Sequence, residues 1–148
     1  MKNLKILNTR EKKELVKKLH ETYGFIGEMD YNVLESEEKI IIAKDISNID
    51  IDKLRIYSLG IVLCDKRKND LILTIEGSQI LGPKCENIFE IDKSYAKQWL
   101  FGKDLEADEE RQGICIVKSC NDYLGCGKLE GNVLKNLISR ERRSAAEE

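Results

Sequence analysis

The sequence has one histidine, one proline and no long apolar run, and each shortage excludes or disfavours a class of protein. His20 is the only imidazole, so we do not expect catalysis by a histidine base. No apolar stretch approaches the roughly 20 residues that cross a bilayer. The N-terminus also lacks the apolar region and the cleavage site of a signal peptide. We therefore expect a soluble, cytoplasmic protein.

Cysteine is present, but its pattern disfavours two common uses. The thiols are odd in number, and no two of them form a Cys-x-x-Cys pair, unlike the cysteines of disulfide frameworks and zinc ribbons. We interpret them as buried or half-buried free thiols, and we expect no metal site. The chain also has no glycine-rich phosphate loop or Gly-x-Gly-x-x-Gly motif, so we expect no cofactor. The five thiols are Cys64, Cys85, Cys115, Cys120 and Cys126.

The size of the chain limits it to one ordinary domain or two small ones. It has 148 residues, of which 41% are hydrophobic and 35% are charged, so it can bury a modest core and remain well solvated. The single Gly-Pro step, Gly82-Pro83, contains the only proline and marks a weak boundary. We therefore predict an N-terminal domain over residues 1–84 and a C-terminal domain over residues 85–148.

The N-terminal pattern predicts a helix followed by an antiparallel sheet. Thr9 can cap the helix, and Gly24 can end it. Its apolar stripe consists of Leu15, Val16, Leu19 and Tyr23, and its lysines are interpreted as a solubilising face. Short β-rich runs predict strands over residues 39–43, 54–57, 60–64 and 71–75, with a loop or helical turn over 45–52 and a charged hairpin loop over 65–70. This half is therefore expected to be a small α+β unit.

The C-terminal pattern predicts a small closed β-barrel with one helix. Residues 87–91 and 113–117 are expected to be strands, and the Asn121-Asp122 turn leads to a glycine-containing hairpin. Asp92 can cap a short helix that Gly102 ends. Residues 104–110 hold five acids in seven positions, and we interpret them as a solvated surface loop. The fold class is therefore α+β.

Four aromatic residues allow two interpretations. Tyr95, Trp99 and Phe101 lie on or just after the predicted helix, where stacking on bases and packing in a core are both possible. Their spacing and apolar neighbours favour the core. Tyr123 is the better candidate for an exposed aromatic ring.

The hairpin carries the strongest candidate site. Gly125 and Gly127 lie two apart on a predicted strand, so they share a face and can leave a slot for another backbone. The segment over residues 128–143 holds five bases against two acids. Such a site suits a polyanion. The alternative is a glycine-rich barrel corner followed by a solvated tail.

The segment over residues 87–143 resembles a PUA domain, a small RNA-binding pseudobarrel. The resemblance rests on the helix-plus-glycine of residues 95–103, the strand over residues 113–117, and Gly125-Cys126-Gly127-Lys128. The PUA-like tail of Sun-type rRNA cytosine-C5 methyltransferases has a similar order and a similar Leu-Lys-Asn ending, matched here by residues 134–143. Ser139 and Arg140 stand in that ending where the family has proline and lysine.

The layout of the whole chain resembles the Nip family of archaeal and eukaryotic ribosome-biogenesis factors, which have a small domain before the PUA domain. The resemblance implies a non-catalytic protein whose PUA half contacts RNA and whose N-terminal half docks a protein partner. The methyltransferase family would require a further cofactor-binding domain and a catalytic cysteine in a Pro-Cys setting. Here Cys85 lies in Pro83-Lys84-Cys85.

These observations together predict binding of structured rRNA or tRNA in ribosome biogenesis or RNA modification, without catalysis. The glycines would admit the RNA backbone, and the basic residues would contact phosphates. The alternative is a protein-interaction adaptor for a separate RNA methyltransferase or assembly factor. The expected RNA-binding residues are Gly102, Lys103, Gly125, Gly127, Lys128, Lys135, Asn136, Arg140 and Arg143.

Overall fold

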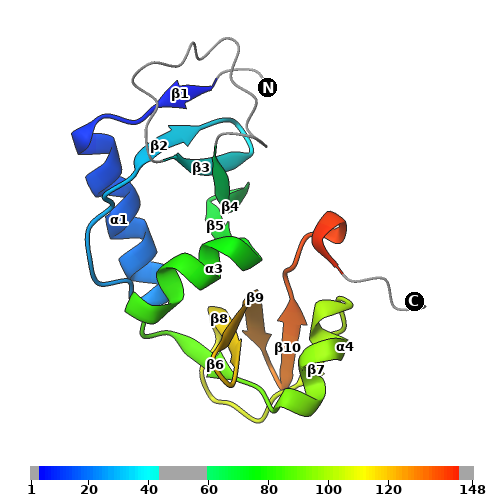
Figure 1. Ribbon diagram of the computed structural model, residues 1–148. Helices are drawn as coiled ribbons and strands as arrows, with labels where there is room; N and C mark the ends of the chain where they lie inside the picture. The colour runs from blue at the N-terminus through cyan, green and yellow to red at the C-terminus, as the bar shows by residue number, and fades with distance from the viewer. Residues whose placement is uncertain (1–3, 44–59, 144–148) are drawn as a thin grey trace.

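The computed structural model describes residues 4–43 and 60–143. These residues form two five-stranded sheets with helices packed beside them (Figure 1), so the expected α+β class is confirmed. The strand order is β1-β2-β3-β4-β5 in the first sheet and β6-β8-β9-β10-β7 in the second. Within the described ranges, no helix combines the length and the apolar character that a membrane span needs.

The first sheet is antiparallel throughout, as predicted. The expected strand at 39–43 is present with those bounds, and those at 60–64 and 71–75 are present with shifted ends. The expected strand 54–57 and the loop 45–52 lie outside the described residues. The elements of this half are β1 (Lys5–Ile6), α1 (Thr9–Tyr23), β2 (Asn32–Glu35), β3 (Lys39–Ala43), β4 (Ile61–Arg67), β5 (Asp70–Leu73) and α3 (Ile75–Leu81).

Helix α1 begins one residue earlier than the sequence suggested. Asn8, rather than Thr9, is the cap: its Oδ1 accepts a hydrogen bond from the Glu11 N–H at 2.9 Å. The Glu11 carboxylate in turn accepts from the Asn8 N–H at 3.0 Å, which completes a capping box. Gly24 ends the helix at φ 68°, in the left-handed conformation, as predicted.

Helix α3 was not predicted from the sequence, which suggested a strand continuing to Ile75. Thr74 caps this helix, because its Oγ1 accepts from the Gly77 N–H at 2.9 Å. The helix lies directly against β4 at Gly77. A Cβ atom at that position would stand 2.1 Å from the carbonyl oxygen of Leu63, so only glycine allows this approach.

The second sheet contains both parallel and antiparallel pairs. Strand β6 runs parallel to β8, and the other neighbours are antiparallel. Asp92 caps the helical segment as predicted, and part of the acidic stretch forms a short edge strand instead of a loop. The elements are η2 (Gly82–Lys84), β6 (Ile88–Glu90), η3 (Lys93–Tyr95), α4 (Ala96–Leu100), β7 (Leu105–Glu106), β8 (Gly113–Ser119), β9 (Asp122–Glu130), β10 (Val133–Asn136) and η4 (Arg140–Arg142).

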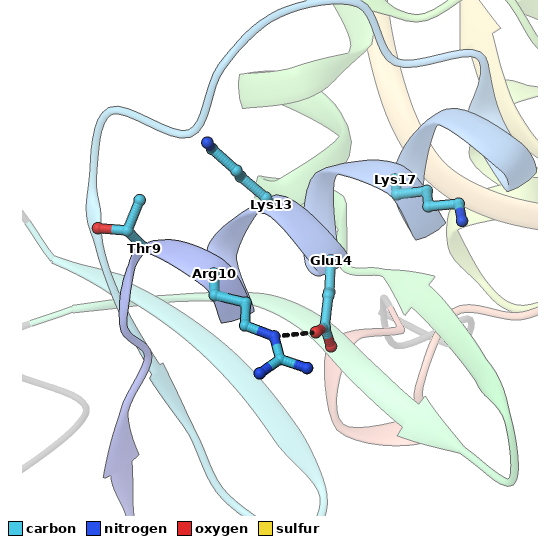
Figure 2. A pocket seen from close by; sticks show the side chains of 5 residues that line it. All are labelled: Thr9, Arg10, Lys13, Glu14 and Lys17. Carbon is cyan, nitrogen blue, oxygen red and sulfur yellow. Dashed lines mark ion pairs between the residues drawn. The ribbon is translucent and has the colours of Figure 1, made fainter.

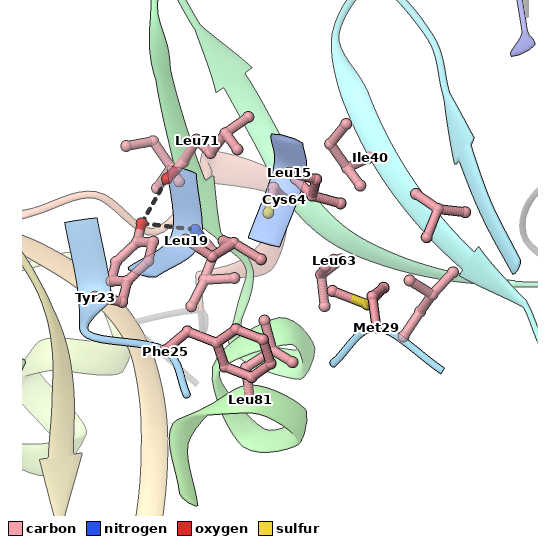
Figure 3. Packing of buried hydrophobic residues seen from close by; sticks show 14 of the residues in the cluster. Leu15, Leu19, Tyr23, Phe25, Met29, Ile40, Leu63, Cys64, Leu71 and Leu81 are labelled. Atoms are coloured by element: carbon pink, nitrogen blue, oxygen red, sulfur yellow. Dashed lines mark hydrogen bonds between the residues drawn. The ribbon is translucent and has the colours of Figure 1, made fainter. Parts of the chain in front are cut away.

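The larger buried cluster contains residues from both halves of the chain. It includes Tyr23, which is fully buried (Figure 3). The Tyr23 hydroxyl donates to the Leu71 carbonyl at 2.5 Å and accepts from the Leu73 N–H at 3.2 Å. Ile116 of β8 and Cys126 of β9 belong to the same cluster, and the Cys126 thiol lies 3.5 Å from the Tyr23 hydroxyl. The division at residue 84 stays a prediction, and the core is continuous across it.

A second cluster fills the C-terminal sheet around Trp99. This side chain is fully buried, and its Nε1 donates to the Leu124 carbonyl at 2.8 Å. The core interpretation of Trp99 is therefore confirmed. Tyr95 differs from that interpretation, because 49% of its surface is exposed.

The thiols follow the sequence prediction with one exception. Cys64, Cys115 and Cys126 are buried, and Cys85 is half-buried. Cys120 is exposed, which corrects the expectation for that residue, because it lies in the turn between β8 and β9 at φ 56°. All five are free thiols.

Candidate nucleic-acid interface

The β9–β10 hairpin places two lysines opposite one another. Lys128 and Lys135 are register partners, and each Nζ lies 3.3 Å from a different carboxylate oxygen of Glu130. The lysine side chains are 44% and 53% exposed. Hydrogen bonds from Lys135 and Lys128 lower the pKa of the Glu130 carboxyl. The group therefore presents two cations to solvent and holds one anion between them.

Sequence reasoning did not identify Glu130 as part of this group. The available signal was the alternation Lys128-Leu129-Glu130, which puts a base and an acid on the same face of a strand. The cross-strand register then adds Lys135 to that face. A phosphate that binds here must compete with the carboxylate.

The glycines of β9 serve the packing of this chain. The space beside Gly127 is filled by Leu134 and Trp99, because a Cβ atom there would stand 2.7 Å from the first and 2.8 Å from the second. At Gly125, φ is 81°, and its N–H donates to Ser78 Oγ of α3 at 2.9 Å. The open slot expected beside these glycines is therefore occupied by the protein's own side chains. Their contact with RNA stays a prediction.

Gly102 and Arg143, far apart in the sequence, lie together. Gly102 has φ 97°, and a Cβ atom on it would stand 2.5 Å from Arg143 Cδ. The Arg143 guanidinium donates through Nε to the Ile138 carbonyl at 3.1 Å. The tail therefore folds back over the loop that follows α4, and the next residue in that loop, Lys103, is exposed.

Asn136 holds the same loop in place. Its Nδ2 donates to the carbonyls of Trp99 at 2.7 Å and Lys103 at 3.1 Å, and its Oδ1 accepts from the Ile138 N–H at 2.9 Å. Its backbone N–H donates to Asp104 Oδ1 at 2.8 Å. The side-chain amide, expected to be available for RNA, is thus engaged within the protein. It positions the loop that carries Lys103.

The remaining basic residues of the tail have different surroundings. Arg140 is exposed and forms no ion pair with any residue of the described ranges. Arg142 is paired with Glu76 of α3, and the Arg67 guanidinium donates to the Leu137 carbonyl at 3.2 Å. Both contacts join the tail to the N-terminal half. The side chains available to an anion are therefore Lys103, Lys128, Lys135 and Arg140, which we call the hairpin–tail cations.

A second basic surface lies on α1. Figure 2 shows Arg10, Lys13, Glu14 and Lys17 on successive turns of this helix, where they line one shallow pocket with Thr9. The Arg10 guanidinium lies 3.4 Å from the Glu14 carboxylate. The sequence interpretation was a solubilising face, and this surface provides a natural comparison for the hairpin–tail cations.

Among the described residues, no group of three or more His, Cys, Asp or Glu side chains could hold a metal ion.

The C-terminal half of the chain is similar to a known family. Residues 86–144 match the family model described as the PUA domain of methyltransferase RsmF. The chain is 24% identical over 134 residues to ribosomal RNA small subunit methyltransferase F of Vibrio cholerae serotype O1, a match that covers 89% of this chain and 28% of the relative. It is 34% identical over 93 residues to the protein of the same name from Shewanella oneidensis, covering 62% of this chain and 20% of the relative. The chain therefore spans about a quarter of these relatives.

Solved structures share the arrangement of nearly the whole chain. A hypothetical protein from Pyrococcus horikoshii OT3 superposes with a TM-score of 0.60 at 14% identity, covering 95% of this chain and 99% of the other. A PUA domain from Aeropyrum pernix K1, in a tartrate complex, gives a TM-score of 0.59 at 11% identity, covering 93% and 86%. At such identities the likeness concerns the fold. The chain is thus an α+β protein whose C-terminal part is a PUA-type pseudobarrel.

Proposed function

We propose that this protein binds structured RNA in rRNA modification, and that the hairpin–tail cations contact the phosphates. The observation that carries the proposal is the match of residues 86–144 to the PUA domain of an rRNA methyltransferase family, in the segment that holds these cations. Lysine and arginine on a rigid scaffold are suited to phosphate contacts. The names of the relatives make small-subunit rRNA the first RNA to test, with tRNA as the second.

We further propose that the described residues contribute binding and not methyl transfer. A cysteine nucleophile needs an accessible thiolate, which a lowered pKa favours. Burial instead raises the pKa of the Cys85 thiol to about 12 and that of Cys115 to about 11. Neither thiol is prepared for attack on a base.

The salt dependence of binding gives the number of phosphate contacts. If four cations each release counterions, the logarithm of affinity should fall against the logarithm of salt concentration with a slope of about −3. The test replaces all four hairpin–tail cations by glutamine. We expect weaker binding to a small-subunit rRNA fragment, a slope near zero, and an unchanged circular dichroism spectrum.

The matched control changes four basic residues of α1 in the same way, namely Arg10, Lys13, Lys17 and Lys18. It removes the same charge from a different surface, so it separates a local contact from the net charge of the protein. Equal losses in both variants, or a loss only in the α1 variant, would overturn the assignment to the hairpin–tail cations.

Substitution of Glu130 should raise RNA affinity, whereas substitution of the hairpin–tail cations should lower it. Glu130→Gln leaves both lysines in place and removes the carboxylate that competes with phosphate. We expect RNA affinity to rise about two- to fivefold at low salt, the range typical of one exposed ion pair. Unchanged affinity would mean that Lys128 and Lys135 do not bind phosphate.

A further inference from the structure

A groove of about 970 Å³ lies on the C-terminal half, and none of the hairpin–tail cations lines it, although Asp104 of its lining directly follows Lys103. It is bounded by β6 and η3 on one side and by β7 with the β9–β10 turn on the other. Strands β6 and β7 are the two ends of the second sheet, so the groove follows the gap where this pseudobarrel does not close.

The strands beside the groove are the two edges of the second sheet. Among the described residues, β6 pairs with β8 alone and β7 pairs with β10 alone. The protein already uses part of the β6 edge, because the Ile88 N–H donates to the Glu86 carbonyl at 3.0 Å and the Ile88 carbonyl accepts from Arg111 at 3.2 Å. The edges are only three and two residues long, so a ligand of the groove would be held mainly by side chains.

The charge of the groove has one sign. Its lining includes five carboxylates, and no lysine or arginine belongs to it in the described part of the chain; the five are Glu90, Asp92, Asp104, Glu106 and Asp108. Asp92 and Asp104 also accept hydrogen bonds from the backbone N–H groups of Ser94 and Asn136. The other three are not ion-paired among the described residues.

One cation beside this lining, Arg111, is already engaged. Arg111 lies over the Phe89 ring at 5.9 Å, and its guanidinium donates to Asn87 Oδ1 and contacts Glu109. It therefore leaves the groove acidic. RNA would meet repulsion here, which distinguishes this surface from the hairpin–tail cations.

Apolar side chains lie between the acids. Phe89, Leu105 and Val133 line the groove and are half-buried, and the ring of Tyr95 is 49% exposed. A ligand that carries only positive charge would contact the carboxylates but would leave the apolar side chains without a partner. A segment that alternates basic and apolar side chains matches both components, because residues of an extended chain alternate in direction.

We propose that the groove between β6 and β7 docks an extended, lysine- or arginine-rich segment of another protein. The acids pair with its basic side chains, and Phe89, Tyr95 and Leu105 contact its apolar ones. None of the hairpin–tail cations lines the groove, so we expect the protein to hold RNA and a protein partner at once.

The test uses the full chain and fluorescein-labelled octapeptides. The probe alternates lysine and valine, one comparison peptide alternates lysine and serine, and another alternates glutamate and valine. The groove variant combines Glu90→Gln, Glu106→Gln and Asp108→Asn, leaving the two capping aspartates intact. The control variant makes the same charge change at exposed positions on the N-terminal half, with Glu21→Gln, Glu28→Gln and Asp30→Asn.

We expect the lysine–valine peptide to bind the native protein and the control variant equally, and the groove variant about tenfold or more weakly. The lysine–serine peptide should bind less tightly, and the glutamate–valine peptide should not bind. Amide NMR shifts should change at Glu90 and Glu106. RNA affinity of the groove variant should be native or higher, so that failure of this proposal and failure of RNA binding are separate results.

Three outcomes would overturn the proposal. They are equal peptide affinity in the groove and control variants, shift changes confined to another surface, and equal affinity for the lysine–valine and lysine–serine peptides. The last would mean attraction to charge without docking in the groove.

Discussion

Asn136 should matter more for stability than for direct contact with RNA. Its side chain makes three hydrogen bonds, to the carbonyls of Trp99 and Lys103 and from the N–H of Ile138. Asn136→Ala removes all three. With roughly 1 kcal/mol for each of the two better-shielded bonds and less for the exposed bond to Lys103, the free energy of unfolding should fall by about 2 kcal/mol. For a domain of this size that lowers Tm by about 4–8 °C.

Asn136→Asp should lower the free energy of unfolding more than Asn136→Ala does. The carboxylate can still accept from Ile138, but it offers acceptors to two carbonyl oxygens that need donors. We expect a loss of about 3 kcal/mol at neutral pH. Urea unfolding can be followed by the fluorescence of Trp99, the only tryptophan, which is buried in the folded state. Lys135→Ala, an exposed neighbour, is the control and should change stability by less than about 0.5 kcal/mol.

The result that would refute this reasoning is a loss below about 0.5 kcal/mol for Asn136→Ala. If such a stable variant also lost RNA affinity, Asn136 would be a direct ligand, as the sequence first suggested. If stability falls as expected, RNA affinity measured well below Tm should decrease only to the extent that the loop carrying Lys103 moves.

Three further perturbations test the packing and the thiols. Tyr23→Phe leaves the paired backbone groups of β5 without a partner and should cost about 1–3 kcal/mol in urea unfolding. Gly77→Ala places a methyl against the Leu63 carbonyl and should cost about 1–3 kcal/mol, and a native-like Tm would contradict the close approach of α3 to β4. Cys120 should be alkylated first under native conditions, as peptide mapping can check, because it is exposed while Cys126 is buried. Burial raises the pKa of the Cys126 thiol to about 12, above the roughly 8.5 of a thiol in the unfolded chain. The stability that the buried neutral thiol contributes is therefore complete below pH 8.5 and is lost as the pH rises toward 12. Urea midpoints should fall between about pH 7 and pH 11, and a flat profile would contradict this.

Local signals in the sequence predicted much of the fold. The periodicity of Leu15, Leu19 and Tyr23 and the stop at Gly24 fix α1. Only its cap was misplaced, because Asn8 and Thr9 are both good caps and the capping box with Glu11 decides between them. Helix α3 was missed for a different reason. It is seven residues long and contains Gly77, so its stability comes from packing on β4 and not from local propensity.

The candidate site was harder to predict because its residues take their roles from contacts far away in the sequence. Gly127 looks like a place for a ligand until Trp99 and Leu134 are seen to fill it. In the sequence Asn136 looks like a free amide, but in the fold its Nδ2 donates to the carbonyls of Trp99 and Lys103. The lysines were recognised from the sequence, but the carboxylate of Glu130 between them depends on strand register. Spacing alone does not reveal which polar groups the fold has already used.

The buried hydroxyl of Tyr23 has a consequence for the segment that matches the family model. The match covers residues 86–144, whereas the likeness to the Vibrio cholerae relative extends over 89% of this chain. The matched segment packs Ile116 and Cys126 into the same cluster as Tyr23 of α1, and the Tyr23 hydroxyl is hydrogen-bonded to Leu71 of β5. Separated from the N-terminal half, this segment would expose apolar side chains that are buried in the whole chain. We therefore expect the segment alone to be less stable than the whole chain.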